Sequence, residues 1–262
     1  MTGGLFAVLD DIAVLLDDAA VMSKVAAKKT AGILGDDLAV NAERATGFRA
    51  SRELPVLWAI TKGSFINKVI IVPLALLLSA YASWLIIPIL LLGGCYLSYE
   101  GVEKIVHYFT HKGHDRGSIE QAVSEKELLQ REKAKIKSAV RTDFILSIEI
   151  IMIALGTVME QPLSLQVMVV TLIAILATVG VYGVVALIVR MDDMGLFLIT
   201  RALGVIGTIA MLLVGGGMFT HNLHALHHAA EVMPAFFINL LIGGAVGLVL
   251  VGAQQLVLKI RS

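Results

Sequence analysis

Hydrophobic residues in this chain come in long runs, and six of these runs are long enough to cross a lipid bilayer. They lie at roughly 55–80, 83–104, 142–160, 164–189, 196–218 and 235–258. A helix needs about 20 apolar residues to cross a hydrocarbon core about 30 Å thick. The runs at 164–189 and 235–258 are the clearest, because neither contains a charged residue. The pattern predicts an all-α, polytopic membrane protein with about six transmembrane helices.

The overall composition supports this fold class. Of the 262 residues, 57% are hydrophobic and 16% are charged, whereas a soluble domain has roughly a quarter charged residues. The lipid bilayer is therefore the first expected partner. A formal net charge of zero gives no reason to expect nucleic acid binding, and the single cysteine, Cys95, excludes an internal disulfide.

The basic residues indicate how the spans are oriented. Eight lysines and arginines lie between Lys24 and Lys68, and nine lie between Lys104 and Arg141. The connections near 80–83, 159–165 and 218–234 contain none. Because basic connections stay in the cytoplasm, we expect both basic regions and the C-terminus on the cytoplasmic side.

The charge pattern divides the chain into four parts. Residues 1–53 are predicted to form a polar helical hairpin, partly embedded in the membrane or cytoplasmic, and residues 54–106 a first transmembrane hairpin. Residues 107–141 are predicted to form a charged cytoplasmic helix, and residues 142–262 a half with four transmembrane helices. An alternative is that residues 3–22 cross the membrane, which would give seven spans.

Three short motifs recur in the same order in the two halves and indicate an internal repeat. The pairs are Asp11–Asp17 with Asp143–Glu149, Ile60–Lys62 with Ile199–Arg201, and Leu91–Gly94 with Leu241–Gly244. Transporters are often built from such repeats. The pattern predicts two sequence-related halves.

Ionisable residues within spans are candidates for function, because charge in hydrocarbon is unfavourable. Glu149 and Arg201 each lie eight residues past the charged start of a span, which places both about 12 Å deep. Equal depth and opposite charge predict that they pair. The pair either fixes the helix register or forms a gated cation or proton site, in which Arg201 competes with the substrate for Glu149.

Other charged residues could complete such a pathway. Asp143 and Glu149 lie about 120° apart around one helix, so a shared ion would need ligands from another helix. We expect Asp11 and Asp17 to supply them, with Lys62 also lining the path. The predicted transport pathway comprises Glu149, Asp143, Arg201, Lys62, Asp11 and Asp17. Ser147, Thr61, Thr200 and Asn67 could add neutral oxygens.

Histidines near the end of the fifth run form a weaker candidate site. His221, His224 and His228 have the spacing of one helix face, so they could bind zinc or a similar metal ion. They could equally form a polar loop that responds to pH. No cofactor is otherwise expected. Because no catalytic motif appears, an enzyme is not expected, and a membrane metalloenzyme is the least favoured class.

Glycines within the spans predict close helix packing. Gly243 and Gly247 form a GxxxG motif, and further glycines lie at 93–94 and 215–217. Small residues let helices approach closely in lipid. The contacts would lie within one chain or between copies in a homo-oligomer.

Several stretches resemble a known family. Gly4–Asp18, Lys24–Ala42, Arg52–Trp58 and the region of His227 and His228 resemble the YedI family of bacterial inner-membrane proteins. The resemblance implies a multi-pass protein of the bacterial inner (plasma) membrane, and it implies no activity. Leu146–Ile150 also resembles tellurium-resistance-type and lysine-exporter-type transporters. Those usually have aspartate followed by asparagine where this chain has Glu149 and Ile150.

Two classes of function are consistent with these features. The favoured one is a secondary transporter or exporter of a small cation or solute, because of the charges in the spans and the repeat. The alternative is a non-transport membrane scaffold or assembly factor, which would use the charged 107–141 helix and the N-terminal hairpin as docking surfaces.

Overall fold

A computed structural model describes residues 3–45, 50–110, 125–190, 193–223 and 233–261. Within these ranges the regular structure is entirely helical, so the predicted fold class is confirmed. The elements are α1 (Gly3–Ala45), α2 (Ala50–Tyr81), the short 3-10 helix η1 (Ser83–Leu85), α3 (Ile86–Thr110), α4 (Glu125–Gly156), α5 (Leu163–Val189), α6 (Asp193–Asn222) and α8 (Ala235–Arg261).

Five helices of the described chain are long and apolar enough to cross a membrane. They cover Arg52–Tyr81, Ser83–His107, Leu163–Val189, Gly204–Asn222 and Ala235–Lys259, and so match five of the six predicted spans. The sixth predicted span, 142–160, is not among them. It is largely the second half of α4, which contains Asp143 and Glu149 and packs against α1, α2, α3 and α5.

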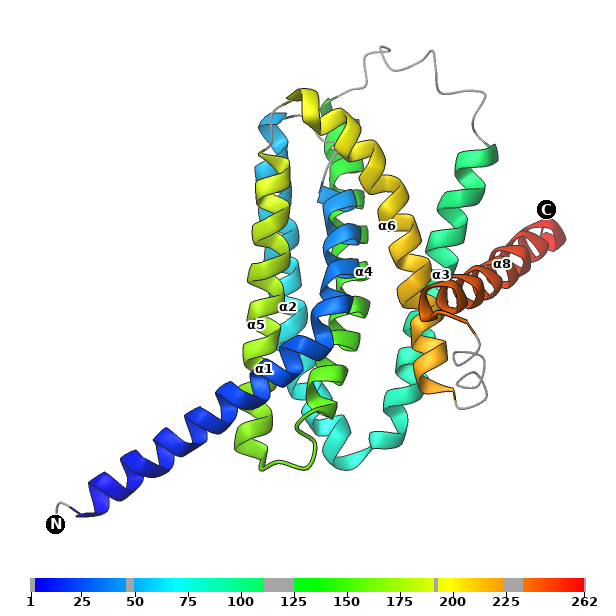
Figure 1. The fold of residues 1–262 in the computed structure, drawn as a ribbon. Coiled ribbons are helices and arrows are strands. Elements are labelled where there is room, and N and C mark those ends of the chain that lie inside the picture. Colours follow the sequence, from blue (N-terminus) through cyan, green and yellow to red (C-terminus); the bar gives the residue numbers. More distant parts are fainter. Residues whose placement is uncertain (1–2, 46–49, 111–124, 191–192, 224–232, 262) are drawn as a thin grey trace.

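Apart from α8 and the first half of α1, which project to the sides, the helices run up and down, so that their ends gather at two opposite ends of the molecule (Figure 1). The helix ends that flank the basic connections lie at one end, which is uppermost in Figure 1: the last turns of α1, α3 and α5 and the first turns of α2, α4 and α6. The connection at η1 and the one between α4 and α5 lie at the other end. We call these the basic end and the non-basic end, because the two connections at the second contain no lysine or arginine.

The predicted N-terminal hairpin is wrong, because residues 3–45 form one continuous helix. The stretch between Ala19 and Ala27 contains no glycine or proline that would end a helix, and its four alanines favour helix continuation. The first half of α1 projects away from the other helices, and its second half lies among them (Figure 1). There α1 packs against α4, α5 and α6.

The helices form two groups that meet at α1 and α4. Buried apolar residues of α1, α2, α4 and α5 make up two clusters on one side, which include Ile71, Ile150 and Val185. A small cluster joins α3, α6 and α8 on the other side. Between them, Leu146 of α4 and Val40 of α1 pack with residues of α3 and α6. The second half of α4 therefore lies at the centre of the bundle.

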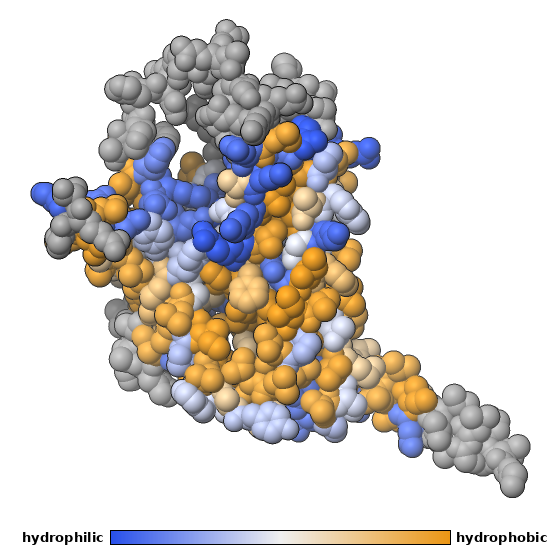
Figure 2. All heavy atoms as spheres, turned by 180° about the vertical axis from the view of Figure 1, so that it is seen from behind, coloured by the Kyte–Doolittle hydropathy of each residue, from blue (hydrophilic) through white to orange (hydrophobic). Residues whose placement is uncertain are grey.

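The outer surface is apolar over the middle of the molecule, as a bilayer requires. Figure 2 shows this belt from one side, with hydrophilic residues gathered towards the basic end. Large exposed apolar side chains on α2, α5 and α8 contribute to the apolar surface, among them Phe65, Val69, Leu77, Ile175, Val179, Leu187, Leu241, Leu248 and Leu256. Such an extent of exposed apolar surface indicates contact with lipid.

Glycines make the close contacts between α3, α6 and α8. A Cβ atom on Gly243 would meet the backbone carbonyl of Leu212, and one on Gly247 would meet that of Ser98. Gly94 and Gly215 likewise face each other's backbone. The predicted role of these glycines in close packing is therefore confirmed within the chain. The homo-oligomer stays a prediction.

We expect alanine at position 243 to destabilise the fold, because its methyl group would force α8 away from α6. Gly243→Ala should cost about 1–3 kcal/mol of unfolding free energy, as overpacking does. Gly244→Ala is the matched control, since nothing lies within 4 Å of a Cβ atom at that position. Thermal unfolding in detergent, followed by circular dichroism, measures both. Equal melting temperatures for the two variants would contradict the packing role.

Candidate functional site

A buried ion pair lies between α2 and α4. Lys68 is 4% exposed and Asp143 is 1% exposed. The Lys68 Nζ atom is 3.6 Å from Asp143 Oδ1. Lys68 interrupts a largely apolar stretch of α2, and Asp143 lies where the charged first half of α4 gives way to its more apolar second half. The two charges can be accommodated there because each is the other's counterion.

Neutral side chains satisfy both members of this pair. The Ser64 hydroxyl donates to Asp143 Oδ1 at 2.8 Å, and the Asn67 amide donates to Oδ2 at 2.9 Å. Lys68 Nζ donates to the hydroxyl oxygens of Ser64 and Ser147, at 2.9 Å in each case. Ser147 also lies 3.4 Å from Asp143 Oδ2. A buried charge pair needs such additional bonds to be stable.

Tyr182 of α5 extends the network to α1. Its hydroxyl lies 3.0 Å from Asp143 Oδ1 and 2.9 Å from Asn41 Oδ1. The Asn41 amide nitrogen donates to Asp37 Oδ1 at 2.6 Å. Asp37 is 2% exposed. We call this network the Asp143 cluster, and it comprises Asp37, Asn41, Ser64, Asn67, Lys68, Asp143, Ser147 and Tyr182.

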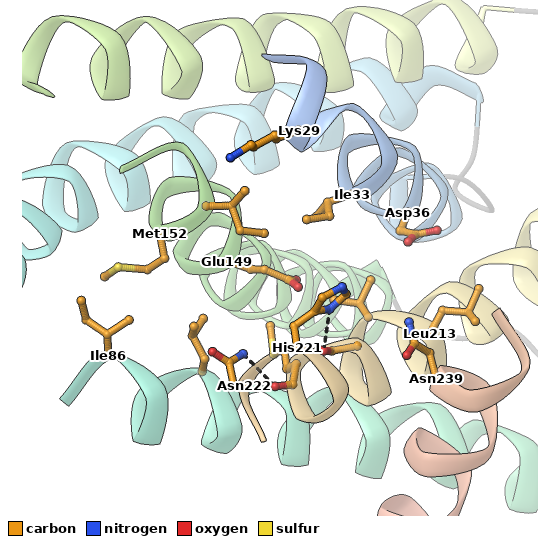
Figure 3. A pocket seen from close by; sticks show the side chains of 15 residues that line it. Lys29, Ile33, Asp36, Ile86, Glu149, Met152, Leu213, His221, Asn222 and Asn239 are labelled. Atoms are coloured by element: carbon orange, nitrogen blue, oxygen red, sulfur yellow. Dashed lines mark hydrogen bonds between the residues drawn. The ribbon is translucent and has the colours of Figure 1, made fainter. Parts of the chain in front are cut away.

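A cavity of about 690 Å³ lies on the other side of α4, between α1, α3, α6 and α8. Figure 3 shows the Glu149 carboxylate pointing into it, with His221 of α6 and Asp36 of α1 among the side chains around it. We call it the Glu149 cavity. It is lined by Lys29, Ile33, Asp36, Ile86, Leu90, Glu149, Met152, Ile153, Leu213, Val214, Gly217, Met218, His221, Asn222 and Asn239.

Glu149 is buried without a full set of partners. Its side chain is 7% exposed, and its Oε2 atom has no hydrogen-bond partner among the described residues. Buried polar atoms in proteins almost always have a partner. This carboxylate oxygen faces the cavity and receives no hydrogen bond from the described helices. It is therefore available to bind a ligand that enters the cavity.

The two sites lie on different faces of α4, as the spacing of Asp143 and Glu149 predicts. A separation of six residues turns the side chains about 120° apart. Asp143 therefore points towards α2 and α5, and Glu149 towards the cavity. On α1, Asp36 lines the cavity while Asp37 belongs to the Asp143 cluster. Adjacent residues of one helix thus connect the two sites.

Ion pairs tie the helices together between the cavity and the basic end. Arg44 of α1 pairs with Glu100 of α3 and donates to Ser138 of α4 at 2.6 Å. Lys104 of α3 lies 2.6 Å from a carboxylate oxygen of Glu43 on α1. The opposite part of the cavity is lined by the first turn of α3 and the last turn of α6. The cavity therefore extends towards the non-basic end.

Only some of the six predicted pathway residues come together. Glu149 faces the cavity, and Asp143 lies at the centre of its cluster. Asp11 and Asp17 are exposed on the projecting half of α1, and Lys62 is exposed on α2. In the described part of the chain, none of these three lines the cavity or belongs to the Asp143 cluster. Arg201 belongs to α6, but its side chain lies outside the described residues, so its pairing with Glu149 stays a prediction.

Sequence reasoning missed several residues that the structure brings to these sites. Lys68 counts among the basic residues of the cytoplasmic regions, although it interrupts the apolar run at 55–80. Asp36 and Asp37 belong to the predicted N-terminal hairpin, away from the bundle. Tyr182 gives no signal, because a single tyrosine in an apolar span is not unusual. Of the predicted neutral oxygens, Ser147 and Asn67 do contact the ion pair.

The histidine site lies mostly outside the described residues. His221 is in the last turn of α6, where its Nδ1 atom is 2.9 Å from the carbonyl oxygen of Gly217. His224 and His228 fall in the range 224–232, which is not described. In the described part of the chain, no group of three or more histidine, cysteine, aspartate and glutamate residues is arranged to hold a metal ion. The metal site stays a prediction.

Comparison with known proteins identifies a family. A family model described as "Protein of unknown function (DUF808)" matches residues 3–203. The matched region contains the whole Asp143 cluster and the Glu149 side of the cavity. Neither a curated protein nor a solved structure matches the chain. The resemblance to the YedI family stays a prediction.

The buried ion pair of Lys68 and Asp143 predicts how three variants change the free energy of unfolding. Lys68→Met leaves Asp143 buried without its counterion and should cost about 3–5 kcal/mol of unfolding free energy. Lys62→Met, at an exposed position of the same helix, should change it by less than about 0.5 kcal/mol. The double variant Lys68→Met with Asp143→Asn removes both charges and should recover part of the loss. Thermal unfolding in detergent measures all three, and a Lys68→Met protein as stable as Lys62→Met would disprove the assignment.

Proposed function

The chain belongs to the DUF808 family of proteins of unknown function, and from its own geometry we propose that it is a secondary transporter or exporter of a small cation or solute. The substrate binds in the Glu149 cavity. The single observation that carries this proposal is the buried Glu149 carboxylate, whose Oε2 atom faces the cavity without a hydrogen-bond partner among the described residues.

The charges of the cavity favour a cation. Two carboxylates, Glu149 and Asp36, and one amine, Lys29, line it. When ionised they sum to one negative charge, and the rest of the lining is uncharged or carries histidine. A negative site surrounded by apolar helices attracts a positive ligand, because a low dielectric strengthens the interaction.

The size of the cavity also fits this proposal. Its volume of about 690 Å³ lies within the range of small-molecule sites. Since a water molecule takes up roughly 30 Å³, the space is sufficient for a hydrated metal ion or a small organic cation.

The closed and open ends of the cavity support alternating access. The pairs Arg44–Glu100 and Glu43–Lys104 join α1 to α3 on the basic side. The cavity extends towards the non-basic end instead. With the basic end in the cytoplasm of a bacterial inner membrane, this structure corresponds to a state accessible from outside. The C-terminus is proposed to be cytoplasmic.

Replacing the Glu149 carboxylate tests the proposal. Full-length protein in liposomes is assayed for uptake of Na+, K+, Li+, Mg2+, Ca2+ and Mn2+, each driven by its own gradient. Wild-type protein should move at least one of these ions. Glu149→Gln should reduce that uptake roughly 10- to 100-fold, the effect of losing an interaction with a charged group. The control is Glu160→Gln, at an exposed position between α4 and α5, which should leave uptake unchanged. Full uptake by Glu149→Gln would refute the role of the cavity.

A membrane scaffold or assembly factor is the second candidate, and the projecting half of α1 favours it. Ile12, Val14, Leu16 and Val21 are exposed there together with Asp17. A scaffold should move none of the six cations. Removing residues 3–20 should then reduce the size of the native complex extracted from membranes and leave the rest of the helices folded. An unchanged complex would argue against it.

A further inference from the structure

We propose that the Asp143 cluster binds a proton, and that the transporter exchanges its substrate for this proton. The inference rests on the proposed function, because it names the coupling ion. It also assigns the Asp143 cluster a role different from that of the Glu149 cavity: the cluster binds the proton and the cavity binds the substrate.

The charge balance of the cluster is the first argument. Asp37, Asp143 and Lys68 are each at most 4% exposed. If all three are ionised, the cluster has one negative charge in excess. Asp36 and Glu149, which face the cavity on the other side of α4, are also acidic, and Lys29 lines that cavity with them. Tyr182 of α5 is a further titratable group in contact with the cluster. An uncompensated charge buried among apolar helices is unfavourable, so one added positive charge stabilises the cluster.

The occupied oxygens of Asp143 indicate that this charge is a proton and not a metal ion. Oδ1 is contacted by Ser64 and Tyr182, and Oδ2 by Asn67 and Ser147. A hard metal ion would need several oxygen ligands and would have to displace these groups. A proton needs only that one hydrogen bond reverse its direction.

The hydrogen bonds of Tyr182 provide for that reversal. Its single hydroxyl proton faces two acceptors, Asp143 Oδ1 and Asn41 Oδ1. The Asn41 amide nitrogen is directed to Asp37, so its oxygen cannot act as a donor. While Asp143 is ionised, Tyr182 can therefore donate to only one of the two.

One added proton completes this arrangement. Bound to Asp143 Oδ1, it is donated to the Tyr182 hydroxyl oxygen, and Tyr182 in turn donates to Asn41. Each group then has a partner, and the one carboxylate charge that remains, that of Asp37, balances the charge of Lys68 within the cluster. The only bond that forms is one O–H bond, and the proton leaves to water when it breaks.

Helix α1 connects the proton to the substrate. Asp36 lines the Glu149 cavity, and the next residue, Asp37, is hydrogen-bonded within the Asp143 cluster. A change in the charge of the cluster therefore acts on the residue next to the cavity. Loading the cluster with a proton reduces the negative charge that holds a cation, so the two bind in competition.

Infrared difference spectra of the full-length protein in liposomes between pH 5 and pH 9 test for the proton directly. Wild-type protein should show the carbonyl band of a protonated, buried carboxyl group at low pH, and Asp143→Asn should lose it. Tyr182→Phe removes one hydroxyl and should shift the band. Tyr99→Phe is the matched control, because the Tyr99 hydroxyl contacts only Glu103 and Gln254 in the described chain, and its band should match the wild type. A band that persists unchanged in both Asp143→Asn and Tyr182→Phe would overturn the inference, and so would the lack of any titrating band.

Flux measurements separate this inference from the proposed function. Liposomes filled with a pH-sensitive dye should report proton movement opposite to the transported cation. Tyr182→Phe should reduce this coupled flux about tenfold, as expected for a lost bond to a charged group. Cation uptake without proton movement would overturn the proton coupling and leave transport standing. A titrating carboxyl band without uptake of any tested cation would overturn transport and leave the buried proton site standing.

Discussion

The structure depends on one constraint: a charged group within a membrane-spanning bundle must face an opposite charge or a polar cavity, and never acyl chains. The position of α4 follows from it. The second half of this helix contains Asp143 and Glu149, and it is surrounded by α1, α2, α3 and α5. The helices with the most apolar surfaces, α2, α5 and α8, provide the outer surface. The same constraint draws the second half of α1 into the bundle, where Asp36 and Asp37 find polar surroundings.

Much of the fold could be predicted from the sequence, because long apolar runs have few alternatives to membrane helices. Five of the predicted spans were predictable for this reason. The close helix contacts of Gly243 and Gly247 were predictable from their GxxxG spacing. The course of α1 could not be predicted, because its mixed composition suits a hairpin, a surface helix and a buried helix alike. For the candidate site, the depth of Glu149 and Asp143 in a span identifies both. Lys68 and Tyr182 could not be identified in this way, because their role comes from contacts with Asp143 on another helix. Lys68 lies 75 residues before Asp143 and Tyr182 lies 39 residues after it, and a single sequence does not show contacts over such separations.

The predicted internal repeat points to acids of α1 that the described structure does not bring to either site, and the reason is physical. Pairing Asp11 and Asp17 with Asp143 and Glu149 assigned the N-terminal acids to the site. The structure brings a different acidic pair of α1, Asp36 and Asp37, to the centre. Acids in the first half of α1 are exposed, where water can solvate them, so they need no partner inside the bundle. Position along the helix, and not similarity of motif, decides which acids become part of the site.

The continuity of α1 has a mechanical consequence. A helix without an interruption transmits a rotation along its length, and Asp11 lies about 39 Å along the helix from Asp37. A tilt of roughly 10° about the buried half would move Asp11 by about 7 Å. The projecting half of α1 would thus convert small rotations around Asp37 into large displacements of its first turns.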